Sequence, residues 1–219
     1  MKRILLLSLT LSATLGSIAA AQTCVGMPSF TSGHMQVAGG GSFTDGVNSF
    51  GASLGYGVPA GLYGKAGLGT TDYDGLDGSS FDLNLSGGYQ TTMGRRHDVA
   101  VCPVANFSYG SGPNDIGGSG VDMSSTSIGF GFMAGKVLGR NPRMQFIPNA
   151  GLGFAYSKIK LEDSAGGSVD GSDSYALATM GVGLLFNSSV SVNPSLSFPI
   201  GQEGGDPVFG LGVALNFGR

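Results

Sequence analysis

The sequence predicts an all-β protein, an antiparallel up-and-down transmembrane β-barrel of about ten strands. Segments of about ten residues alternate apolar with small or polar types, as from Phe81 to Tyr89, where the odd positions are mostly apolar. A period of two places the two classes on opposite faces of a strand. Turns rich in Gly, Asp, Asn or Pro separate the segments. Many such strands behind a secretory leader are typical of barrels that cross a membrane.

The first 21 residues fit a cleavable signal peptide. Two basic residues precede a short apolar run, and three alanines at 19–21 supply a cleavage site of the A-x-A type. The run is shorter than the roughly 20 apolar residues that a membrane-spanning helix needs. We therefore expect a cleaved signal peptide at 1–21, a periplasmic or lumenal segment at 22–33 and the barrel at 34–219.

The composition supports this interpretation. Glycine supplies 41 of 219 residues, well above the ~7% usual for soluble domains, and charged residues make up 11% against ~25%. Small residues are expected where side chains crowd inside a narrow barrel, because glycine is otherwise unfavourable in strands. The chain has more acidic than basic residues and no basic stripe, which excludes a nucleic-acid-binding protein.

Ten segments are predicted to be strands: 34–43, 49–58, 61–72, 80–90, 98–109, 122–138, 144–159, 174–187, 189–199 and 207–217. Bacterial barrels have an even number of strands, short periplasmic turns and longer external loops. The connections at 44–48, 73–79, 110–121, 160–173 and 200–206 carry most of the acidic residues and are predicted to be external. An eight-stranded barrel remains the alternative if the first two segments are misread.

Aromatic residues are predicted to mark both edges of the membrane, as the aromatic belts of membrane proteins do. One set lies near the external ends of the strands: Phe50, Phe81, Tyr109, Tyr156, Tyr175 and Phe209. The other set lies near the periplasmic ends: Tyr56, Tyr89, Phe146, Phe186 and Phe217.

The chain resembles the small outer-membrane β-barrels of diderm bacteria, the OmpA-type and porin-like single-domain proteins. The resemblance rests on the leader, on the strand pattern and on the final strand from Val208 to Phe217. The resemblance covers residues 22–219. It implies insertion in the cell outer membrane, contact with its lipid and lipopolysaccharide, delivery by periplasmic chaperones and the barrel-assembly machinery, and a monomer. It also implies an assembly signal in the last strand, formed by Phe209, Leu211, Val213, Leu215 and Phe217.

Two cysteines, Cys24 and Cys102, form the most specific pair of residues. An even number of cysteines in an oxidising compartment favours a disulfide. The alternation predicts that Cys102 faces the lumen, so a bridge would draw residues 22–33 across the periplasmic mouth or into the lumen and partly plug the barrel. Two free thiols are the alternative.

The other candidate sites are weaker. Asp72, Asp74 and Asp77 lie in a glycine-containing loop that could bind a cation such as calcium, but their spacing does not fit an EF-hand and a solvated loop is the simpler interpretation. The two histidines, His34 and His97, lie away from the external acidic residues. We therefore expect no catalytic site, no metal and no cofactor.

Two functions follow from these patterns. The first is a structural or surface-interaction barrel without enzymatic activity, with its lumen partly plugged. The second is a narrow, porin-like channel for ions or small solutes, which the scarcity of bulky residues among the inward positions would favour. The sequence names no specific ligand or solute.

Overall fold

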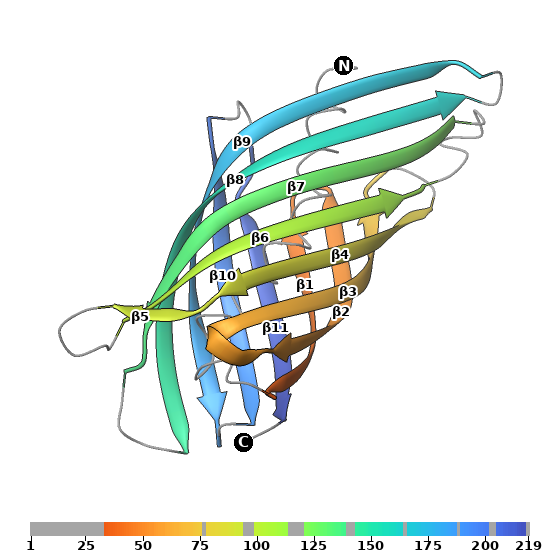
Figure 1. The fold of residues 1–219 in the computed structure, drawn as a ribbon. Coiled ribbons are helices and arrows are strands. Elements are labelled where there is room, and N and C mark those ends of the chain that lie inside the picture. The colour runs from red at the N-terminus through yellow and green to blue at the C-terminus, as the bar shows by residue number, and fades with distance from the viewer. Residues whose placement is uncertain are drawn as a thin grey trace.

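The protein is a closed antiparallel β-barrel (Figure 1). The computed structural model describes residues 33–75, 78–93, 99–113, 121–138, 143–163, 166–187, 189–201 and 205–217. Its strands are β1 (Met35–Thr44), β2 (Val47–Gly57), β3 (Leu62–Tyr73), β4 (Ser79–Tyr89), β5 (Thr91–Met93), β6 (Val99–Ser111), β7 (Val121–Lys136), β8 (Met144–Asp163), β9 (Ser168–Phe186), β10 (Val190–Ile200) and β11 (Val208–Phe217).

Ten strands form the wall. Each strand pairs with its neighbours in sequence, β1 also pairs with β11, and β4 pairs with β6. The three-residue β5 follows β4 after Gln90 and pairs with the beginning of β6, so it extends β4 and does not add an eleventh strand to the wall. The ten predicted segments are confirmed, and the eight-stranded alternative is wrong. No helix among the described residues has the length and hydropathy needed to cross a membrane.

The two ends of the barrel differ in shape. We call the end that carries the tip of the β8–β9 hairpin the outer end, and the opposite end, where β1 begins and β11 ends, the inner end. In Figure 1 strands β4 and β6 to β9 run together across the near wall and cross the strands of the far wall steeply, and β8 and β9 extend furthest at the outer end. A strand needs about 9–11 residues to cross a bilayer. Strands β8 and β9, with 20 and 19 residues, are therefore about twice as long as a bilayer crossing requires.

The expected difference between short inner turns and long outer loops is only partly seen. The β1–β2 connection at the outer end consists of Asp45 and Gly46, a sequence typical of tight hairpins, and Gly46 has a positive φ of 72°. The predicted external loop at 160–173 is wrong, because regular pairing between β8 and β9 continues to Glu162 and Ser168. The charged residues suggested a loop, but Lys158, Lys160 and Glu162 lie on the outward face of β8, while Ile159 and Leu161 face inward.

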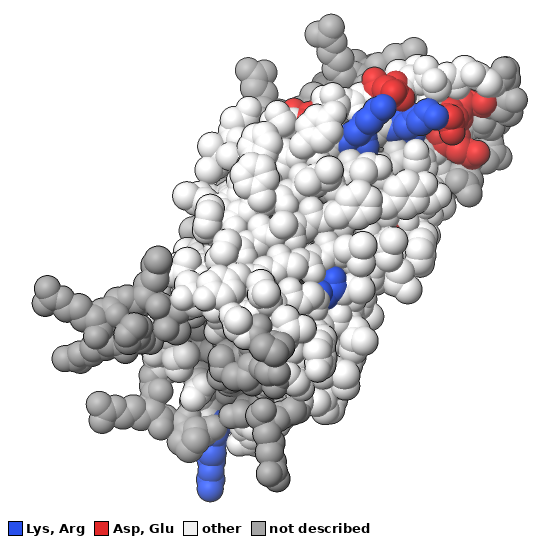
Figure 2. Space-filling view, viewed as in Figure 1, with Lys and Arg blue, Asp and Glu red and all other residues white. Residues whose placement is uncertain are grey.

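The alternation of side chains is confirmed along the wall. Large apolar residues that the pattern predicted to face outward are between a third and two thirds exposed; examples are Phe50, Leu68, Phe107, Phe132, Leu152 and Phe209. Of the predicted aromatic belt, Tyr175 is placed wrongly: it is 3% exposed and packs inside the barrel. Figure 2 shows that charged side chains on this face gather at the tip of β8 and β9, while the wall below is nearly free of charge.

Candidate functional site

The barrel lumen is the part of the structure where polar side chains converge. Inward positions of the wall are occupied mainly by buried Ser, Thr, Asn and Gln together with Gly. The buried polar residues are Gln36, Ser42, Ser49, Lys65, Thr71, Ser80, Ser108, Ser125, Ser127, Asn149, Ser157, Thr179, Ser191, Asn193, Ser195, Ser197 and Asn216. Hydroxyl pairs join neighbouring strands, such as Ser108 with Ser127 at 2.7 Å and Thr179 with Ser197 at 3.0 Å. The middle of the lumen is therefore polar, as the alternation predicted.

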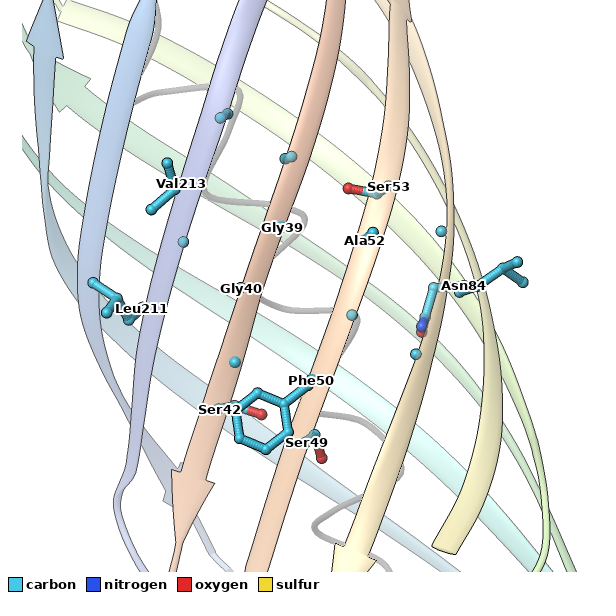
Figure 3. Close-up of a pocket in the computed structure, with 18 of the residues that line it drawn as sticks. Gly39, Gly40, Ser42, Ser49, Phe50, Ala52, Ser53, Asn84, Leu211 and Val213 are labelled. Carbon is cyan, nitrogen blue, oxygen red and sulfur yellow. The ribbon is translucent and has the colours of Figure 1, made fainter.

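Four glycines form a row across the inner face of four adjacent strands. Gly69 on β3 is opposite Gly51 on β2, Gly51 is opposite Gly40 on β1, and Gly40 is opposite Gly212 on β11. The row lines a cavity of about 100 Å³. Figure 3 shows the small side chains of the neighbouring serines on β1 and β2 beside this region. The missing side chains leave this part of the lumen hollow.

Glycine is required here because the backbones of adjacent strands approach closely. A Cβ built on Gly40 would lie 2.5 Å from the carbonyl oxygen of Leu211, and one built on Gly51 would lie 2.9 Å from that of Leu68. Close approach of this kind marks a sharp bend in a sheet. The glycine row therefore serves two purposes, since it allows the wall to curve and it opens space inside.

Substitution of Gly40 by alanine is expected to destabilise the folded barrel by about 1–3 kcal/mol, as overpacking of a tight site does. The matched control is Gly64→Ala on β3, because a Cβ at this exposed glycine meets nothing within 4 Å. Urea midpoints of both variants refolded in the same vesicles measure the difference. Equal midpoints for the two variants would show that the contact at Gly40 relaxes without cost.

One cation and one carboxylate face the cavity. Lys65 on β3 is 8% exposed and Asp82 lies on β4. Asp82 Oδ2 accepts a hydrogen bond from Thr71 Oγ1 at 2.7 Å, and that hydroxyl also pairs with the hydroxyl of Ser49 at 2.9 Å. The two charges are separated along the wall. Lys65 is opposite Ser86, four residues beyond Asp82, which corresponds to about 13 Å of strand.

A cluster of apolar side chains crosses the lumen near the outer end. It contains Val47 on β2, Tyr73 on β3, Met123 on β7 and Ile159 on β8, all at most 7% exposed, with Leu161 packed against them. Strands β2 and β8 lie on opposite sides of the ring of ten. A cluster with members on both strands therefore spans the interior. These residues correct the expectation that small and polar side chains alone dominate the inward positions.

A second apolar cluster lies nearer the inner end and contains the lumenal cysteine. Cys102 on β6 is fully buried and packs with Tyr63 on β3 and Met133 on β7. The prediction that Cys102 faces the lumen is thus confirmed, and the described residues include no free cysteine. Cys24 lies outside the described residues, so its bridge to Cys102 stays a prediction.

The remaining predicted site residues are not brought together. Asp72 is exposed at the outer end of β3 and Asp74 lies in the turn that follows, while Asp77 and His97 lie outside the described residues. His34 precedes β1 at the inner end. Within the described ranges, no group of three or more His, Cys, Asp or Glu residues is arranged to hold a metal ion. Outward positions on β11 carry the five residues of the predicted assembly signal, each 41–46% exposed.

Sequence reasoning missed Lys65 as a site residue. The signal was present, because Leu62, Ala66 and Leu68 mark the outward face of β3 and the alternation then points residue 65 inward. Lys65 differs from most other charged residues because it lies in the middle of a strand and away from the loops.

Charged residues also gather at the tip of the β8–β9 hairpin, at the outer end of the barrel. Lys158 Nζ lies 2.8 Å from Asp170 Oδ2, and Lys160 pairs with Glu162. The hydrogen bond from Lys158 lowers the pKa of Asp170, and the hydrogen bond and charge of Glu162 raise the pKa of Lys160. All four side chains are largely exposed, so the pairs stabilise the tip only weakly.

The Lys158–Asp170 pair is expected to be lost on acidification. Because the pKa of Asp170 is lowered on folding, its contribution is present above the ordinary value of 3.8 and disappears as the pH falls through the lower, folded pKa. Asp170→Asn should therefore increase the mobility of the tip at pH 6 and change nothing at pH 2. Backbone ¹⁵N order parameters of wild type and variant at both pH values measure this. A difference that persists at pH 2 would contradict it.

The barrel is similar to solved structures of bacterial barrels. It matches the β domain of the Bordetella autotransporter BrkA with a TM-score of 0.54 and 14% identity, over 84% of this chain and 98% of that one. The chain has the fold of an outer-membrane β-barrel. It is also similar to the N-terminal barrel of Pseudomonas aeruginosa OprF (TM-score 0.38, 20% identity, 85% of this chain and 98% of that one) and to the KdgM porin (TM-score 0.41, 7% identity, 84% and 99%). No protein-family model and no curated protein matches the sequence.

Proposed function

We propose that this protein is a non-enzymatic barrel of the bacterial outer membrane, with a structural or surface-interaction role and a lumen closed to solutes. The observation that carries the proposal is the apolar cluster of Val47, Tyr73, Met123 and Ile159, which spans the lumen near its outer end. An aqueous pathway through this layer would require water to replace tight apolar contacts, which is unfavourable. The outer layer therefore closes the barrel.

The outward belt of large apolar residues supports a place in a membrane. A soluble monomer rarely exposes a continuous apolar surface, since patches above a few hundred Å² are uncommon. Here apolar residues are exposed on every long strand; one per strand is Val37, Leu54, Leu68, Leu85, Phe107, Phe130, Leu152, Met180, Ile200 and Leu211. With a periplasmic N-terminus, the outer end would face the surroundings of the cell and the inner end the periplasm.

The projecting β8–β9 hairpin supports the surface-interaction part of the proposal. Pairing of β9 with β10 begins at Ala176, so the described residues 168–175 of β9 pair with β8 alone. This leaves an open strand edge outside the membrane, with Val169 62% exposed and Asp170 and Asp173 beside it. An open edge can accept an extended segment of a partner by strand addition.

A narrow channel is the second candidate, because the middle of the lumen is polar and contains the cavity of about 100 Å³. Single-channel recording in planar bilayers, on refolded residues 22–219 with and without reductant, separates the two functions. A folded barrel that is silent in both conditions supports the closed lumen. Steady conductance without reductant would overturn it, and conductance that appears only with reductant would assign the closure to the predicted disulfide-tethered segment.

A further inference from the structure

The cavity beside the glycine row contains a buried positive charge that no described residue neutralises. Lys65 is 8% exposed, lines the cavity, and forms no ion pair or hydrogen bond with another described residue. The inward carboxylate on the same part of the wall, Asp82, is engaged by Thr71 and lies about 13 Å further along the strand. An isolated ammonium group inside a protein is costly unless it is paired or well solvated.

The groups around the cavity are suited to an anion. The ammonium group of Lys65 offers three hydrogen-bond donors. Asn84 and Asn193 add side-chain amides, and Ser53 and Ser86 add hydroxyls, all of them lining the same cavity. Asn193 is 6% exposed, and its NH₂ group is the part of the side chain that could donate a hydrogen bond to an anion. The site is less suited to a hard cation, which takes several oxygen ligands, because Asp82 is the single carboxylate among the lining residues.

We propose that Lys65 anchors a binding site for a small inorganic anion, of the size of chloride or bromide, in the barrel lumen. The glycine row supplies the space, because side chains at Gly40, Gly51 and Gly69 would occupy the cavity that Lys65 faces. The cavity of about 100 Å³ is several times the roughly 10–15 Å³ that one water molecule needs on the same measure, so it holds such an ion with water molecules beside it. The proposal goes beyond the closed-lumen function and does not depend on it.

The comparison ion in the experiment is gluconate, a long polyhydroxylated carboxylate. It carries the same single negative charge as chloride but needs much more of the space between the lining strands. A halide can instead contact the ammonium group of Lys65 and the neighbouring amides and hydroxyls at once. We therefore expect small anions to bind more tightly than gluconate.

The test uses the full chain, expressed with its leader and purified from membranes in detergent. Crystals containing bromide are expected to show an anomalous peak in contact with Lys65 Nζ. In solution, the ³⁵Cl line width should broaden in proportion to protein, and bromide should reverse the broadening at millimolar concentration while gluconate does not. Lys65→Met should lose the peak and weaken the apparent affinity at least about tenfold, as loss of a hydrogen bond to a charged group implies.

Lys160→Met is the matched control, because Lys160 is exposed at the hairpin tip, and it should leave the lumenal peak in place. Lys65→Met removes a buried charge and is expected to fold, which heat-modifiable migration checks; if it does not fold, Asn193→Ala is expected to weaken chloride binding several-fold. A wild-type map without a peak at Lys65, a peak that appears only at molar bromide, or broadening that is unchanged in Lys65→Met would each overturn the proposal.

Discussion

Leu152→Arg is expected to destabilise the barrel in lipid vesicles by about 2–4 kcal/mol. Leu152 is 66% exposed on the outward face of β8, near the middle of the part that the proposed function places in the membrane. An arginine on the lipid face of a transmembrane barrel carries a penalty of this size at the bilayer midplane. The free energy of unfolding in denaturant, for wild type and variant refolded into the same vesicles, measures the effect.

Val169→Arg is the matched control for Leu152→Arg. Val169 is 62% exposed, almost the same as Leu152, but it lies on β9 in the hairpin tip that the proposed function places outside the membrane. Its substitution should change the stability by no more than about 0.5 kcal/mol, the usual range for surface positions in water. Similar small effects at both sites would contradict a membrane location, because a soluble β-barrel exposes both residues to the same solvent.

The strands could be predicted because the two faces of each strand carry different residue types. A large apolar outward face and a crowded lumen impose strict alternation, and the predicted segment 207–217 differs from the observed β11 by one residue at its start. The prediction failed at residues 160–173, where the hairpin extends past the neighbouring strands. There Lys158 and Lys160 lie on the outward face and Ile159 is buried inside, so the residue types on the two faces are the reverse of those along the rest of the wall.

For the candidate site, the sequence predicts only which residues of each single strand face inward. The inward parity of Lys65, Tyr73 and Met123 can be inferred from their neighbours in the sequence. Which inward residues meet across the lumen depends on the register and tilt of strands that are far apart in the chain. The row that brings Gly40 opposite both Gly51 and Gly212 joins the first, second and last strands of the barrel, and nothing in the local pattern specifies it.

Removal of the outer apolar layer is expected to convert a silent barrel into a conducting one. The double substitution Tyr73→Ala and Met123→Ala shortens two side chains that meet inside the barrel from β3 and β7. The wall of paired strands remains, so the variant should fold with a stability reduced by several kcal/mol, in line with large-to-small changes at buried sites. Planar bilayer recording with and without reductant should show steady conductance for the variant and none for the wild type.

The control for this variant removes similar apolar volume from the outer face. Tyr109→Ala and Ile128→Ala, on β6 and β7, shorten residues that are 43% and 55% exposed to the surroundings, and should leave the lumen closed. If the lumenal variant folds and stays silent even with reductant, the cluster at the outer end is not what closes the barrel. If the control variant conducts as well, the conductance arises from a destabilised barrel wall and not from removal of the lumenal cluster. Conductance of the lumenal variant alone would identify Tyr73 and Met123 as the layer that separates the polar interior from the outer surface.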